Sequence, residues 1–319
     1  MGLKKGYKRR NDKIDGICFP ISCNEIYMKK YRSFILVNMF LFSIIIGCVP
    51  QGLSETSTSA ILHVGGNGSG NYTNIQDAIN AAYAGDTIFV FNGTYHENLI
   101  VNTSIQLIGE DRNTTIINGS RNGCVIILTA DQVMITGFTI TWGGLVFPDA
   151  GICVESTDNT IAGNIIIENY YGMHMSYFSG NTLISENYIE NNHQCGVYFS
   201  RSSNNRLIGN TVLHQPSNGF GLYESSNNNT IMGNTLGYNG FCGVNIRESS
   251  RNRVQDNQFI GNNIGLHVPP PESHTSICSN SFSENRIAYE EEYDLSAFSL
   301  VIVIVLIFIV FIVLRKKVE

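Results

Sequence analysis

Asparagine recurs along this chain at a fixed interval of 23 or 24 residues, and a second asparagine follows most members of the series after five residues. A repeat of this length indicates a solenoid in which each repeat forms one coil. The first series is Asn164, Asn187, Asn210, Asn234, Asn257 and Asn280, and the second is Asn169, Asn192, Gln215, Asn239, Asn262 and Asn285.

Each repeat has room only for short strands. A glycine opens an alternating run in every unit, as in GVYF at 196–199 and GVNI at 243–246, and a further apolar column runs from Ile161 to Ile277. Alternation predicts strands, and about three strands per repeat leave no space for a helix. The pattern therefore excludes helical and leucine-rich repeats. It predicts an all-β fold, a parallel β-helix of roughly nine or ten three-strand coils spaced at about 4.8 Å.

The asparagine columns have a structural explanation in such a fold. A residue at the bend between two strands must tolerate left-handed backbone angles, which asparagine does well. Its amide also donates to and accepts from the same residue one coil away. We therefore expect the columns to form hydrogen-bonded ladders at the corners.

Two apolar runs suggest how the chain is placed in the cell. Residues 1–50 hold a basic segment followed by the apolar run at 33–49, which is typical of a signal peptide from Met28 onward or of an uncleaved anchor. Cys48 ends a lipobox-like IIGC, but we expect it to be an ordinary residue of the hydrophobic region. Residues 295–314 contain no charge and are long enough to span a bilayer. The basic tail at 315–319 predicts a cytoplasmic C-terminus. The expected body is extracytoplasmic and anchored to the cell membrane.

The body between the apolar runs is acidic. Residues 51–294 contain eight Arg, no Lys and 22 Asp plus Glu, and such a surface repels nucleic acid. N-x-[ST] sequons are permissive for glycosylation outside the cell, so we expect a glycoprotein. They lie at Asn67, Asn71, Asn92, Asn102, Asn113, Asn118 and Asn228.

Five cysteines of the body are expected to be free. Cys195 and Cys242 share a column but stand two coils apart, which is roughly 9.6 Å by strand spacing and beyond the reach of a disulfide. We predict packed thiols at these two positions and at Cys124, Cys153 and Cys278.

The order of segments follows from these patterns. After a linker at 51–60, the β-helix should cover residues 61–289, with a regular array from about 133. A helix over 75–83, capped by Asn74 or Thr73, should cover the open end of the first coil. Residues 290–294 form an acidic linker before the membrane span.

Three parts of the chain resemble right-handed parallel β-helix proteins, in particular the NosD-type domains of archaeal surface proteins. They are NYTNIQDAINAAYAGDTIFVFNGTYHENLIV at 71–101, SIQLIGEDRNTTIING at 104–119 and the GN-x-I repeats that follow. The opening is also similar to that of pectin methylesterases, which share the turn at Gly93–Glu97. The paired catalytic aspartates of that family and the NTD, DD and GHG motifs of polygalacturonases have no match. The resemblance therefore implies the fold and leaves the activity open.

The strands that follow the repeat glycines place one set of residues outward, which gives the most varied polar and aromatic strip in the chain. On this strip Glu155 and His174 are the one carboxylate–imidazole pair close enough to work on a single glycosidic bond. Glu224 and Glu248 lie one coil apart and could contribute to a Ca²⁺ site. The column is Cys153, His174, Tyr198, Gly221, Asn245 and His267, with Glu155, Ser176, Ser200, Tyr223, Arg247 and Pro269 beside it.

The NosD resemblance implies an association with copper, for which Cys153 and His174 would be adjacent soft ligands. Met173 and Met175 have suitable chemistry but should face the core. Solvated surface is the alternative to both the catalytic and the metal interpretation.

An inserted loop at 142–150 carries the only tryptophan, Trp142. Aromatic faces beside a flat β-helix wall suit sugar stacking, and the alternative is a loop folded onto its own aromatics. The candidate ligand-binding residues are Trp142, Tyr177, Tyr198, Tyr223 and Arg247.

Three functions remain open on this basis. The first is a monomeric, membrane-anchored β-helix that binds glycan or forms part of the cell envelope. The second is a polysaccharide lyase, hydrolase or epimerase that uses Glu155 and His174. The third is an accessory protein in copper-enzyme maturation.

Overall fold

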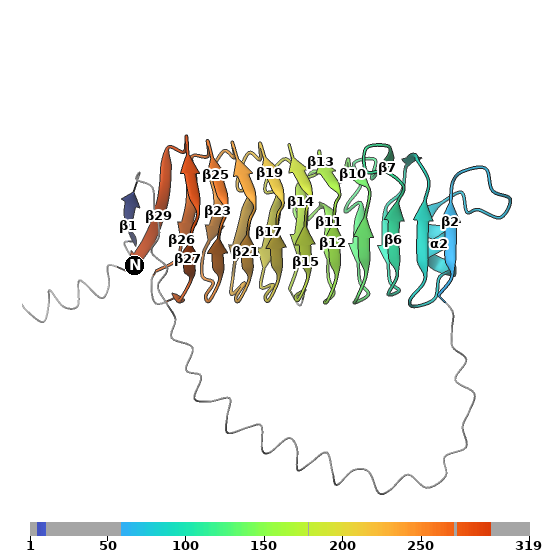
Figure 1. The fold of residues 1–319 in the computed structure, drawn as a ribbon, viewed down its shortest axis with the longest axis horizontal. Coiled ribbons are helices and arrows are strands. Elements are labelled where there is room, and N and C mark those ends of the chain that lie inside the picture. The colour runs from blue at the N-terminus through green and yellow to red at the C-terminus, as the bar shows by residue number, and fades with distance from the viewer. Residues whose placement is uncertain (1–4, 11–58, 178, 271–272, 295–319) are drawn as a thin grey trace, which may run out of the picture. The chain divides into compact units, whose positions relative to one another are not determined.

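The computed structural model describes residues 5–10, 59–177, 179–270 and 273–294. Within this part the chain winds into about ten coils, and Figure 1 shows their strands side by side in a row from β2 to β29. A parallel β-helix with three sheets is therefore confirmed. All strand pairs in the row are parallel, as between β14 and β17, where His174 lies opposite Tyr198.

The three sheets, named A, B and C here, are defined by their strands. Sheet A contains β1 (Lys5–Arg10), β5 (Leu99–Val101), β8 (Ile126–Leu128), β11 (Ala150–Val154), β14 (Tyr171–Met175), β17 (Val197–Ser200), β20 (Phe220–Tyr223), β23 (Cys242–Ile246), β26 (Ile264–Val268) and β29 (Ile287–Asp294). Sheet B contains β2 (Ile61–Val64), β3 (Thr87–Val90), β6 (Gln106–Gly109), β9 (Met134–Thr136), β12 (Thr160–Ala162), β15 (Leu183–Ser185), β18 (Arg206–Ile208), β21 (Thr230–Met232), β24 (Arg253–Gln255) and β27 (Ser276–Cys278). Sheet C contains β4 (Gly93–Tyr95), β7 (Thr115–Asn118), β10 (Thr139–Thr141), β13 (Ile165–Ile167), β16 (Tyr188–Glu190), β19 (Thr211–Leu213), β22 (Thr235–Gly237), β25 (Gln258–Ile260) and β28 (Ser281–Ser283).

Hydrogen-bonded ladders run along the corners between the sheets. At the B–C corner Asn187 accepts from the backbone N–H of Asn164 at 3.0 Å, and its amide donates to Asn210 at 3.1 Å and to the Ile161 carbonyl at 2.8 Å. The second predicted column bonds in the same way at the C–A corner, with Gln215 in its place. The expected ladders are thus confirmed.

A third ladder, which the sequence did not reveal, follows the A–B corner through Asn205, Asn229 and Asn252. The expectation that the ladder asparagines themselves take left-handed backbone angles was wrong. The residue before each ladder position takes the left-handed conformation, as Glu186, Asn191 and Asn204 do at φ 54°, 51° and 63°. The ladder side chain is therefore turned inward to bond across coils, and its own backbone is not left-handed.

The repeat glycines allow neighbouring coils to approach closely. A Cβ atom on Gly219 would lie 2.6 Å from the carbonyl oxygen of Gly243, and the same contact recurs at Gly172 and Gly196 with the coil that follows each. No side chain fits at this position. Inside the coils the core is apolar, and it includes Met173 and Met175, which are fully buried as expected.

Helix α2 (Ile75–Ala81) ends two residues earlier than predicted and packs against β2, β3 and β5. Its N-cap, Asn74, makes no capping bond to the helix backbone. Instead the carboxylate of Glu97 accepts hydrogen bonds from Ile75 and Gln76 at 2.8 and 2.9 Å. Glu97, two residues after β4, thus supplies the helix with an anionic cap, which its macrodipole favours.

The ends of the chain differ from the expectation in two respects. Residues 290–294, predicted as a linker, form the second half of β29. Strand β1, from the basic N-terminal segment, pairs with β29 in antiparallel register, with Lys8 opposite Glu291. The predicted span at 295–314, the apolar run at 33–49 and Cys48 lie outside the described residues, and within those residues no helix is long and apolar enough to cross a membrane.

We expect Asn187→Ala to lower the free energy of unfolding by about 2–4 kcal/mol, because it removes the buried amide that accepts from the backbone N–H of Asn164 and donates to the Ile161 carbonyl. Chemical denaturation of the variant and the wild type measures this loss. Asn80→Ala, on the exposed face of α2, is the matched control and should change stability by less than about 0.5 kcal/mol. Equal losses in both variants would contradict the ladder's role.

Candidate functional site

The outward face of sheet A carries the strip that the sequence predicted. The strand register places Cys153 opposite His174, His174 opposite Tyr198, and Asn245 opposite His267. The column continues one coil further than expected, because Glu290 of β29 lies opposite His267.

Most of this column is covered, contrary to the expectation of a solvent-exposed strip. Cys153 and His174 expose 4% and 8% of their surface, and Asn245 and His267 expose 2% and 1%. Tyr198 is half-buried. Loops and neighbouring long side chains lie over the face. The repeat pattern of the sequence does not predict this covering.

The loop at 142–150 covers the N-terminal part of the face. Its Phe147 ring lies 6.0 Å from His174 and 6.4 Å from both Tyr171 and Tyr198, measured between ring centroids. The amide of Asn169 holds the start of the loop by accepting from Gly143 at 2.8 Å. Phe147 therefore contacts the aromatics of the wall with one side of its ring, although 62% of the residue remains exposed.

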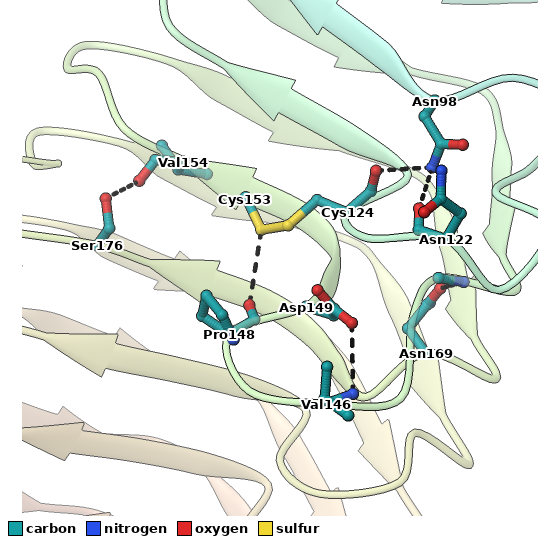
Figure 2. Close-up of a disulfide and its surroundings, with 11 residues drawn as sticks. Asn98, Asn122, Cys124, Val146, Pro148, Asp149, Cys153, Val154, Asn169 and Ser176 are labelled. Carbon is teal, nitrogen blue, oxygen red and sulfur yellow. Dashed lines mark hydrogen bonds between the residues drawn. A yellow bond between two sulfur atoms is a disulfide. The ribbon is translucent and has the colours of Figure 1, made fainter.

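A disulfide joins Cys124 to Cys153 beside this loop (Figure 2), with Cα atoms 6.1 Å apart. The prediction of free thiols at these two positions was therefore wrong, and Cys278 is also disulfide-bonded. The reason is geometric. Cys124 lies in the turn before β8, outside the regular repeat, so its distance to other cysteines does not follow from the spacing of the coils. Cys195 and Cys242 are free and buried, as predicted, and burial raises the pKa of both thiols.

Tyrosines form a stack along the middle of the face. Tyr171 and Tyr198 are stacked with centroids 4.8 Å apart, and Tyr223 follows Tyr198 at 5.2 Å. Tyr223 lies over Gly221, where a Cβ atom would meet its ring at 2.6 Å. Its hydroxyl accepts from the amides of Asn218 and Asn245 at 2.9 and 3.3 Å. Burial raises the pKa of all three tyrosines.

Two exposed aromatic rings border the stack. Trp142 is 47% exposed, and the Arg121 guanidinium lies 4.4 Å from its ring centroid. Tyr177, in the turn after β14, is 53% exposed and has Arg201 at 5.6 Å. Each arginine also pairs with a carboxylate, Glu168 and Glu224 respectively. The two rings therefore stand at opposite ends of the sheet A strands, each with polar groups beside it.

The predicted catalytic pair lies on adjacent strands, but its members differ in environment. Glu155 follows β11 and is exposed, whereas His174 is buried below Phe147. Among the described residues no hydrogen bond or ion pair joins their side chains. Burial lowers the pKa of His174, and a hydrogen bond to the Pro148 carbonyl opposes this shift only partly.

Charged and polar groups form the C-terminal end of the face. His267 Nδ1 lies 3.2 Å from Glu290, and Nε2 lies 3.5 Å from Glu292. Arg247 follows β23 and is half-buried beside this group. Burial lowers the pKa of His267, and the nearby Arg247 charge lowers it further.

The seven sequon asparagines all lie at the surface. Asn67, Asn92, Asn102, Asn113 and Asn228 are exposed, and Asn71 and Asn118 are half-buried. The ladder asparagines, in contrast, are buried. The structure thus separates the two uses of asparagine that composition alone could not distinguish.

The sequence model of the family described as "Periplasmic copper-binding protein (NosD)" matches residues 79–295. The chain belongs to this family. That match agrees with the resemblance drawn from the repeats and with the three-sheet solenoid.

Two curated relatives share parts of the chain. A "Cell surface glycoprotein" of Methanothermus fervidus is 32% identical over 117 residues, which is 36% of this chain and 18% of the relative. A "Probable pectinesterase/pectinesterase inhibitor 6" of Arabidopsis thaliana is 40% identical over 78 residues, 22% of this chain and 14% of the relative. The chain therefore spans less than a fifth of the length of either relative.

Solved structures share the fold at low identity. The Agl-KA catalytic domain has a TM-score of 0.57 at 15% identity, with 75% of this chain and 50% of that chain covered. The catalytic domain of GH87 α-1,3-glucanase in complex with nigerose has a TM-score of 0.55 at 12% identity, with 74% and 47% covered. At such identities the similarity shows the fold alone.

The described residues do not fit the copper that the family name implies. Cys153 has no thiolate to offer because its sulfur belongs to the disulfide, and Met173 and Met175 face the core. In the described part of the chain no three His, Cys, Asp or Glu side chains converge on a common point, which also applies to the Ca²⁺ candidates Glu224 and Glu248. Glu224 is engaged by Arg201 at 3.3 Å.

The buried histidines predict acid sensitivity. A folded-state pKa below the ordinary value of 6.5 means that the unfolded chain binds more protons just below that pH, so stability should fall as the pH drops through this window. His174→Gln should make the decline between pH 7.5 and 5 shallower in urea denaturation. The exposed His96→Gln is the control and should decline like the wild type; an unchanged slope in His174→Gln would refute the contribution of His174.

Proposed function

We propose that this protein is an extracytoplasmic β-helix that binds a surface or extracellular polysaccharide along the outward face of sheet A, without cleaving it. One observation carries the proposal: Trp142 before β11 and Tyr177 after β14 are exposed, and the half-buried Tyr198 lies on the face of sheet A itself. Aromatic faces of this kind offer stacking surfaces for sugar rings.

The polar groups beside these rings suit the same ligand. Arg121 and Arg201 provide donors, and Glu168 and Glu224 provide acceptors, next to the exposed rings. Sugar hydroxyls donate and accept hydrogen bonds, so they can bond to both kinds of group. Tyr223 and Arg247 extend the surface toward the C-terminal coils.

An extracytoplasmic location has independent support. Disulfides such as Cys124–Cys153 persist mainly in oxidising compartments. The sequons are accessible, one relative is named a cell surface glycoprotein, and the family is named periplasmic. We further propose that residues 295–314 anchor the protein in the cell membrane, that α2 closes the first coil, and that the body is a monomer within the envelope.

The alternatives have weaker support. A lyase, hydrolase or epimerase would need His174 to reach substrate, and Phe147 lies over it. A role in copper-enzyme maturation, which the family name favours, would need ligands other than Cys153. Copper titration of the full chain, followed by spectroscopy, would separate that role from glycan binding.

Binding should depend on the exposed rings. We expect Trp142→Ala and Tyr198→Ala to weaken polysaccharide binding by roughly 1–3 kcal/mol, by analogy with the stacking of bases on aromatic side chains. A glycan array on the full chain identifies the ligand, and calorimetry on any polysaccharide it binds measures the loss. Tyr83→Ala is the control, because this exposed tyrosine follows α2 and lies away from the face.

Glu155→Gln should leave binding nearly unchanged and should not affect any product release. If the protein releases sugar products and Glu155→Gln abolishes the release, the enzyme alternative is correct. If the array shows no binding to envelope or extracellular polysaccharides, a purely structural role in the envelope is the better conclusion.

Protease added to intact cells should remove residues 59–294, because we propose that this body lies outside the membrane. Antibodies against the body and against the basic C-terminal tail, used before and after permeabilisation, measure the two locations separately. Full protection of the body would refute the proposed topology.

A further inference from the structure

Arg247 differs from the other arginines that border the outward face of sheet A. Arg121 pairs with Glu168 at 3.6 Å and Arg201 pairs with Glu224 at 3.3 Å. Arg247 makes no ion pair within the described part of the chain, although the body is strongly acidic. An unpaired cation that is half-buried needs an explanation, because burial of a charge costs free energy unless the charge is paired.

Two carboxylates at this end of the face contact His267. Glu290 and Glu292 lie at 3.2 and 3.5 Å from the two ring nitrogens of His267. The charge of Arg247 is nevertheless felt by its neighbours, since it lowers the pKa of His267 and opposes the raised pKa of Tyr223. Arg247 therefore lies between the tyrosine stack and the acidic end of the face without a counterion of its own.

Two polar atoms at this position are buried and unsatisfied. Arg247 Nε and Asn245 Oδ1 have no hydrogen-bond partner among the described residues, and Asn245 is only 2% exposed. The two residues are two positions apart, so both project from the same face of the chain at β23. Such atoms cost stability when they remain unpaired. A bridging water could satisfy both atoms, but it would not neutralise the guanidinium.

The aromatic surface ends at the same place. Tyr223 lies in the coil before Arg247, and its hydroxyl accepts from the Asn245 amide at 3.3 Å. The Tyr198 ring lies 5.2 Å from that of Tyr223. A sugar ring stacked on these tyrosines would place its substituents beside the guanidinium.

We infer that Arg247, with Asn245 and Tyr223, forms a subsite for an anionic substituent, a carboxylate or a sulfate, of an acidic polysaccharide. This inference rests on the proposed function and names the class of its ligand. A guanidinium suits such groups because its planar fork can donate two parallel hydrogen bonds to one oxyanion. The acidic body repels a dense polyanion, so the ligand should carry its charges sparsely, between neutral sugars.

The test uses the purified full-length chain on an array of neutral, carboxylated and sulfated polysaccharides. The polysaccharides bound by the wild type should be acidic, and chemical reduction of the carboxylates or removal of the sulfates should weaken binding to an extent similar to the loss of Arg247. Arg247→Met should weaken binding about tenfold or more, as expected for the loss of a charge-assisted hydrogen bond. Arg206→Met, which removes an exposed arginine on β18 of sheet B, away from the proposed binding face, is the control and should change the affinity much less.

The melting temperature of the Arg247→Met variant distinguishes a ligand-binding role from a structural one. Because Arg247 Nε is buried without a partner, Arg247→Met should leave the melting temperature unchanged or raise it. A lower melting temperature together with unaltered binding would overturn the inference and make Arg247 a structural residue.

The remaining outcomes separate the two proposals. Binding of neutral polysaccharides alone, or equal losses in Arg247→Met and Arg206→Met, would overturn the anionic subsite while leaving polysaccharide binding intact. Absence of any polysaccharide binding would overturn both.

Discussion

The hydrogen bonds of the corner amides are the constraint on which the rest of this structure depends. Strand bonds are interrupted wherever the chain turns from one sheet to the next, and buried backbone groups cannot remain unpaired at low cost. Asn187 restores them by bonding to the coil on each side. Because the amide must reach the equivalent residue of the next coil, the ladders fix the register. The register in turn decides which side chains share a column on the outer face.

The fixed register brings side chains from distant parts of the sequence together on the outer face of sheet A. One column brings together Cys153, His174, Tyr198 and His267, which lie far apart in the sequence. Their environments are set locally by the loop at 142–150, the disulfide and the last strand. Because such a scaffold accepts many different polar side chains on its outer face, the fold alone does not identify the activity.

Much of the fold was predictable from the sequence, because its cause is periodic. The asparagine columns, the inward Met173 and Met175 and the outward register follow from a 23-residue repeat and from strand alternation. The third ladder escaped notice because a threonine, Thr182, occupies its column ahead of Asn205. The candidate site was less predictable: Phe147 and the Cys124–Cys153 bond lie in or beside non-periodic loops, where spacing along the chain gives no distance in space.

The sequence by itself determined that this chain is a parallel β-helix with an acidic body, since repeats and charges are properties of the chain. Only the tertiary structure decided which polar residues are accessible. Exposed sequons and buried ladder asparagines are the same residue type, and Arg201 and Arg247 look alike in sequence. Burial and pairing separate them, because both depend on neighbours one or two coils away.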